Sequence, residues 1–395
     1  MNVEADRPRF AARAALAAVA VLLLSSAPIR AEEPDPVETR RIMREVFGAL
    51  QKLLPLSLDE KRFADPALRP EILQALGTLS RNAGRLSAHG AGRGESFEFL
   101  SRSLAREAAE IERRYAAGRI REAQFELHEF TENCVVCHSR LPDARDAELS
   151  SRFMDEAAIA ALPLPERANL AMATRQFERA LAAHEAMLTS PEFDVSSIDL
   201  LGYLDDYLEV CLRVKGDFER PARALAAFAK RSDVRPGLRD DVVQWVADLR
   251  ELGARGPIEG LAAGRRLAQE AEAAAAKRGE QALLVRFQAA SGTLQRTVAS
   301  LPDGDPRAAE AYYWLGVIES RVGRSFWLSQ TEPYLEAAIR LAPGDPLAEQ
   351  AYARLEEFVV AGYSGSSGEH VPADVKAWLE ELARLVAAAQ GEDRS

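Results

Sequence analysis

Two of the chain's three cysteines and one of its five histidines fall within CVVCH, at positions 134–138. Thiols and an imidazole at this spacing have four chemical uses: a disulfide, half of a metal finger, a redox-active dithiol, or the attachment point of a haem. Cys134 and Cys137 are three residues apart, so on a helix both thiols face the same side. The surrounding elements and the compartment decide between these uses.

The N-terminus predicts the compartment. Arginines precede a short apolar run over residues 14–24, and a polar stretch then leads to Ala31 and an acidic segment. This order is typical of a cleaved secretory signal, and the run is shorter than the about 20 apolar residues that span a bilayer. We predict a signal peptide over residues 1–31 and a soluble, exported mature protein, periplasmic or otherwise outside the cytoplasm. A retained N-terminal anchor is the alternative.

Length and charge narrow the function classes. At 395 residues the chain is long for one core, so two or more domains are expected. The formal net charge is −11, and removal of the predicted signal would make it more negative. Such an acidic surface argues against nucleic acid and anionic lipid as partners. No later stretch is apolar enough for a membrane helix, so the mature chain is not expected to span a membrane.

Export then selects among the four uses of CVVCH. A metal finger needs a second ligand pair, but the one remaining cysteine is Cys211 and no HxxxH follows. A redox dithiol belongs at a strand-to-helix turn, whereas the residues around CVVCH are helical in pattern. The remaining interpretation is C-x-x-C-H, with one haem c bound covalently through Cys134 and Cys137, and with His138 as the axial ligand of the iron. A disulfide between the two cysteines is the alternative.

Four amphipathic helices are expected to position this motif, which predicts an all-α fold that begins with a four-helix bundle. The first opens at Asp35-Pro36, the second follows Pro70, the third runs from about Ser96 to Gly118, and the fourth starts at Ile120. In the fourth helix, apolar residues recur in an a/d pattern that includes both cysteines. Its members are Ile120, Ala123, Leu127, Phe130, Cys134, Cys137 and Leu141.

Residues 33–145 resemble the class II c-type cytochromes, the cytochrome c-prime and c-556 group. The resemblance implies an antiparallel bundle with the haem motif near the end of its last helix, and often a homodimer. "TRRIMREVFGAL" is similar to the first helix of that family, which places Met43 over the distal face of the iron and Phe47 near the porphyrin. If Met43 ligates, the iron is six-coordinate; if it only packs, the iron is open to small gases. His89, in a glycine-rich link, is a second candidate distal ligand.

The region from residue 150 to 395 resembles tetratricopeptide repeats, which predicts an α-solenoid of helix pairs. The clearest unit is "AEAYYWLGVIESRVG", residues 309–323, with the helix that follows it. Residues 173–191 and 213–231 match the repeat pattern more weakly. A last helical pair is expected at the C-terminus. The link "GYSGSSGEHVP" is too rich in Gly and Ser to be ordered by itself. Residues that match the repeat pattern are Tyr312, Leu315, Gly316, Gly323, Ala338 and Pro343.

These patterns predict an exported monohaem cytochrome that transfers electrons, with the repeat region docking a protein redox partner. The alternative function is a haem-based gas sensor or binding scaffold with an open distal site. We expect no enzymatic activity, because the chain has no GxSxG, Walker loop or HExxH and only one CxxCH. The other histidines, His128, His184 and His370, are predicted to be structural or surface residues, and Cys211 to be a buried, inert thiol.

Overall fold

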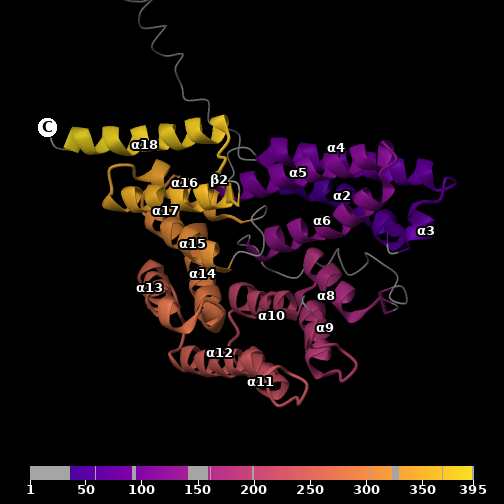
Figure 1. The fold of residues 1–395 in the computed structure, drawn as a ribbon, viewed down its shortest axis with the longest axis horizontal. Helices are drawn as coiled ribbons and strands as arrows, with labels where there is room; N and C mark the ends of the chain where they lie inside the picture. The colour runs from indigo at the N-terminus through magenta and orange to yellow at the C-terminus, as the bar shows by residue number, and fades with distance from the viewer. Residues whose placement is uncertain are drawn as a thin grey trace, which may run out of the picture.

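The computed structural model describes residues 36–57, 59–90, 95–140, 159–160, 162–197, 200–302, 304–322, 329–366 and 368–393. The predicted signal peptide, Leu141 and Gly323 lie outside these residues. The described part is almost entirely helical, so the predicted all-α class is confirmed (Figure 1). The N-terminal helices are α2 (Pro36–Ser57), α3 (Glu60–Phe63), α4 (Arg69–Gly90), α5 (Glu95–Ala116) and α6 (Ile120–Arg140).

The four long N-terminal helices pack side by side around one apolar core. α4 contacts α2 and α5, and α6 contacts α5 and α2. Two residues begin and end these helices as their chemistry predicts: Pro36 is the first residue of α2, and Gly118, just after α5, has a φ of +80°. The short helix α3 is an element that the pattern did not predict. It carries Phe63, whose carbonyl accepts a hydrogen bond from Tyr115 Oη at 3.0 Å.

The chain continues through helices, most of which pack against a neighbour in sequence. The first are α8 (Leu164–Ala173), α9 (Phe177–Thr189), α10 (Leu200–Glu209), the π-helix η2 (Val210–Lys215), α11 (Glu219–Phe228), α12 (Pro236–Ala254) and α13 (Leu261–Arg278). The 3-10 helix η3 (Gln281–Leu283), α14 (Leu284–Ala299), α15 (Ala308–Val322), α16 (Thr331–Leu341), α17 (Pro346–Gly362) and α18 (Ala373–Asp393) complete the set.

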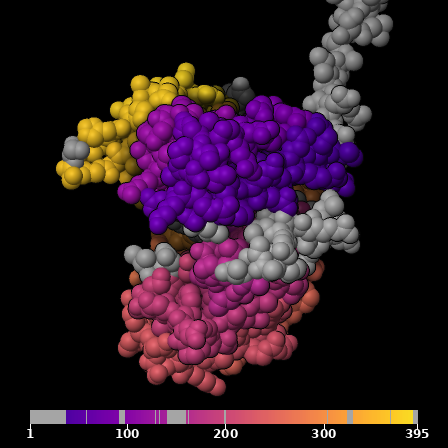
Figure 2. All heavy atoms as spheres, turned by 90° about the vertical axis from the view of Figure 1, so that its right-hand side faces the viewer, coloured from indigo at the N-terminus to yellow at the C-terminus, as the bar shows by residue number. Residues whose placement is uncertain are grey.

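These C-terminal helices trace an arc rather than a straight rod. From α8, next to α6, the chain runs away from the N-terminal helices to α11 and α12 and returns through α14 and α15 (Figure 1). α16 then contacts α5. Figure 2 shows the resulting arrangement, with the N-terminal helices (indigo to purple) and the C-terminal end (yellow) together above the α8–α12 part (magenta to rose). α6, which carries CVVCH, contacts α8 and η2 of this region.

Close helix packing explains one small residue of the repeat-like pattern. A Cβ at Gly316 in α15 would lie 2.6 Å from the side chain of Leu335 in α16. A larger residue at this position would require the Leu335 side chain or the helix to shift, because atoms cannot approach so closely. Ala338 of α16 is buried in the core that these helices share with α17 and α18. The predicted reason for small residues at these positions is therefore met in the structure.

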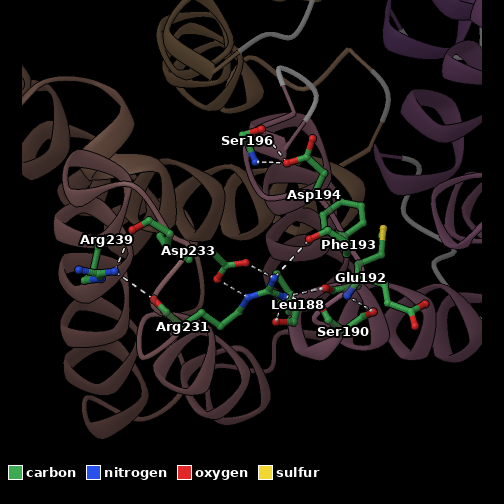
Figure 3. Close-up of polar contacts among 11 residues, drawn as sticks. Leu188, Ser190, Glu192, Phe193, Asp194, Ser196, Arg231, Asp233 and Arg239 are labelled. Carbon is green, nitrogen blue, oxygen red and sulfur yellow. Dashed lines mark hydrogen bonds and ion pairs between the residues drawn. The ribbon is translucent and has the colours of Figure 1, made fainter.

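Arg231, in the turn between α11 and α12, binds the end of α9 and the loop that follows it. Arg231 donates hydrogen bonds to the carbonyls of Leu188, Ser190 and Phe193, and its guanidinium also pairs with Asp233 at 2.6 Å (Figure 3). The last carbonyls of a helix have no partner within the helix, so a cation there satisfies them. This contact holds the loop after α9 against the turn that leads to α12.

The link before α18 differs from its prediction. It was expected to lack order of its own, but β1 (Ser364–Gly365) and β2 (Gly368–Glu369) pair as an antiparallel hairpin. Gly368, the first residue of β2, has a φ of +108°, a conformation that glycine adopts readily, so the same glycine content that predicted disorder permits this pairing. The backbone of His370 adds a hydrogen bond to the carbonyl of Tyr363 at 3.0 Å.

Candidate functional site

The CVVCH residues lie in the last turns of α6. Cys134 is buried, with 7% of its surface exposed, and Cys137 and His138 are partly buried. The a/d pattern holds in the core: Ala123, Leu127 and Phe130 are fully buried, while Ile120 is partly exposed. Because the helix continues unbroken from Ile120 to Arg140, the two thiols share one side of it, as the spacing predicts.

Helix α2 places Met43 and Phe47 at the same end of the N-terminal helices as CVVCH. Gln124 Nε2 of α6 donates a hydrogen bond to the carbonyl of Ser57 at 2.5 Å, so the start of α6 meets the end of α2. Met43 lies 14 residues before Ser57, and His138 lies 14 residues after Gln124. At 1.5 Å per residue, both lie about 21 Å from that contact.

Met43 and Phe47 are partly buried and pack against the same core that contains Cys134. The structure thus brings the two predicted distal residues to the level of the motif. It gives Met43 the surroundings of a core side chain; whether its sulfur ligates a metal stays a prediction.

His138 lies against the first C-terminal helix. The backbone of Ala173, the last residue of α8, is close enough to affect the pKa of the imidazole. The Nδ1 atom is buried and has no hydrogen-bond partner among the described residues. An unsatisfied buried nitrogen is uncommon in proteins and is a feature that a bound group can explain.

Burial also keeps this imidazole neutral. Loss of solvent is the main reason that the pKa of His138 falls to about 4, and the positive charge of Arg175 lowers it further. The backbone of Ala173 acts on the pKa of His138 in the opposite direction but is outweighed. A metal ligand must present an unprotonated nitrogen, so a neutral imidazole is the form that iron needs.

The thiol of Cys137 has the properties of an unreactive cysteine. Burial raises the pKa of Cys137 to about 12, although the nearby Arg175 opposes the shift. A redox-active dithiol depends on a thiolate, which a low pKa supplies. The surroundings of Cys137 therefore disfavour the dithiol interpretation. The described residues include all three cysteines, and no disulfide joins any two of them.

Sequence reasoning missed the residues that anchor the end of α6. Ser139, directly after the motif, is buried, and its Oγ donates a hydrogen bond to Glu209 Oε1 at 2.6 Å. Glu209 also accepts a hydrogen bond from Arg213 Nη1 at 3.0 Å. The signal was present in "YLEVCLRVKG", where a Glu and an Arg four residues apart interrupt an apolar run. Such a pair within a buried stretch indicates an internal ion pair.

The remaining candidates lie away from this arrangement or have other roles. His89 belongs to the last turn of α4, so its placement in a flexible link was wrong: the helix extends through Gly90 before the glycine-rich segment. His184 is buried, with its ring 6.0 Å from that of Tyr207, as expected of a structural residue. Cys211 is fully buried in η2, and burial raises its pKa, as predicted for an inert thiol. The side chain of His128 lies outside the described residues.

Comparisons with protein-family models, with curated proteins and with solved structures find no match to this chain. Within the described ranges, no helix is both long and apolar enough to cross a membrane. The same residues contain no group of three or more His, Cys, Asp or Glu side chains that could hold a metal ion by themselves. The motif on α6 and its surroundings are thus the basis for a functional assignment.

Proposed function

We propose that the chain is an exported monohaem c-type cytochrome that transfers single electrons. One observation carries the proposal: Cys134, Cys137 and His138 lie on one side of α6, with the imidazole neutral and its buried Nδ1 atom without a hydrogen-bond partner among the described residues. A bound haem c supplies an iron that takes up and releases one electron. Cys134 and Cys137 would hold the porphyrin by thioether bonds, and His138 would ligate the iron.

The packing of the helices supports the finer parts of the proposal. α2, α4, α5 and α6 correspond to the four-helix bundle of a class II cytochrome, with Met43 and Phe47 at the haem end. The helix pairs that follow correspond to a tetratricopeptide-like array, a fold that offers extended surfaces to protein partners. In the proposed function this region docks the redox partner. The acidic charge of the chain favours a partner with a basic surface.

The ligand at the sixth coordination position of the iron distinguishes the electron-transfer function from the gas-sensing function. Met43 is the ligand in our proposal, so the reduced holoprotein should show a low-spin optical spectrum that carbon monoxide does not change. A Met43→Ala variant should become high-spin and bind the gas, because a His/Met iron loses its sixth ligand. Optical spectra recorded with and without carbon monoxide measure both the spin state of the iron and the binding of the gas.

Met187→Ala is the matched control, since Met187 is a buried methionine in α9, outside the N-terminal helices. It should keep the low-spin spectrum. Rapid gas binding by the unaltered holoprotein would contradict the Met43 ligand and favour the sensor function.

A further inference from the structure

A buried polar cluster joins the haem-motif helix to the C-terminal helices. It consists of Ser139 of α6, Glu209 of α10, Arg213 of η2 and Glu319 of α15, all of which are buried. Ser139 and Arg213 both donate hydrogen bonds to Glu209, and Arg213 Nη2 lies 4.0 Å from Glu319 Oε2. We call these four residues the Ser139 cluster. It connects the residue next to His138 with helices that follow much later in the chain.

The backbone around Arg213 is held in an uncommon conformation. Arg213 lies in the π-helix η2, and π-helical segments are rare and frequent at functional sites. A Cβ at Gly292 of α14 would lie 2.9 Å from the Arg213 Cα, so only glycine permits this approach. Arg296 Nη1 also donates a hydrogen bond to the Arg213 carbonyl at 3.3 Å. These contacts fix the direction in which the Arg213 side chain enters the cluster.

The charged side chains of the cluster are buried away from solvent. The side chains of Arg213 and Glu209 are 0% and 3% exposed, so solvent does not screen them. The guanidinium of Arg213 faces the carboxylates of both Glu209 and Glu319. Arg175 is a further cation near the motif, and it acts on both Cys137 and His138.

We infer that the Ser139 cluster sets the reduction potential of the iron, with Glu209 as its main positioning residue. This inference rests on the proposed haem attachment. Oxidation of the iron adds one positive charge, which a buried negative charge stabilises. The carboxylate of Glu209, one hydrogen bond away from the residue that follows His138, therefore lowers the potential. The repeat-like region is in this way part of the redox site and not only a docking module.

Glu209→Gln tests the inference in the full-length holoprotein. The substitution removes one negative charge and keeps the side-chain volume, so the reduction potential should shift in the positive direction. Glu219→Gln is the control, because it removes the same charge from a side chain that is 90% exposed. Redox titration followed by optical absorption gives both potentials. Equal potentials for the two variants would overturn the inference.

A second variant covers the case in which Glu209→Gln does not fold. Glu319→Gln removes a negative charge from the same cluster but leaves Arg213 paired with Glu209. Its potential should also be more positive than that of Glu219→Gln, and equality would again overturn the inference. Absence of covalent haem from the unaltered protein would instead refute the proposed function. The two failures are therefore distinguishable.

Discussion

Replacement of both Cys134 and Cys137 by alanine is expected to abolish covalent haem attachment. The two thiols lie on one side of α6, and each would form one thioether bond to the porphyrin. The double variant, produced in cells with haem-attachment machinery, should therefore have the mass of the bare polypeptide. Intact-mass spectrometry after denaturation and a haem stain on a denaturing gel measure this directly.

Two matched variants make the result specific. Cys211→Ala removes the third cysteine, which is fully buried in η2 and distant in sequence from the motif. That variant should keep a full complement of haem. Each single variant, Cys134→Ala or Cys137→Ala, should retain at most one thioether link. Haem that remains covalently bound to the double variant would show that another residue attaches it and would contradict the assignment.

Arg213→Met is expected to lower the free energy of unfolding by about 3–5 kcal/mol. The substitution keeps a long side chain but removes the guanidinium that donates a hydrogen bond to the buried Glu209, and loss of a partner from a buried ion pair is costly. The hydrogen bond from Ser139 to Glu209 would remain. Urea denaturation of the purified protein measures the change.

The chain offers a close control for this substitution. Arg223 pairs with Glu219 at 3.5 Å across the same four-residue spacing, but the two side chains are 73% and 90% exposed. Exposed ion pairs contribute little, so Arg223→Met should change stability far less. The double variant Glu209→Gln/Arg213→Met should recover part of the lost stability, because it removes the buried charge of Glu209 together with that of Arg213. Equal effects of Arg213→Met and Arg223→Met would contradict the role of the buried pair.

Most helices could be predicted from local signals. Pro36 begins α2, Gly118 follows α5, and the apolar spacing from Ile120 gives the course of α6. These signals depend only on neighbouring residues, which is why they are readable without a structure. The short helix α3 was missed because four residues are too few to show a helical period. The end of α4 was placed too early because the glycines after His89 resemble a link.

The long-range contacts of the site could not be read in the same way. CVVCH identifies three of its residues by spacing alone. Nothing in the sequence connects Ser139 with Glu209, because the contact joins residues 70 positions apart and depends on how α10 and η2 return to α6. The proximity of the Ala173 backbone to His138 has the same origin. Tertiary packing, and not local pattern, thus decides which C-terminal residues surround the motif.

The most direct test of the central claim is the mass and visible spectrum of the unaltered protein purified from cells with working haem-attachment machinery. We predict a coloured protein whose denatured mass exceeds that of the processed polypeptide by one haem. A colourless protein with the mass of the bare chain would contradict the account.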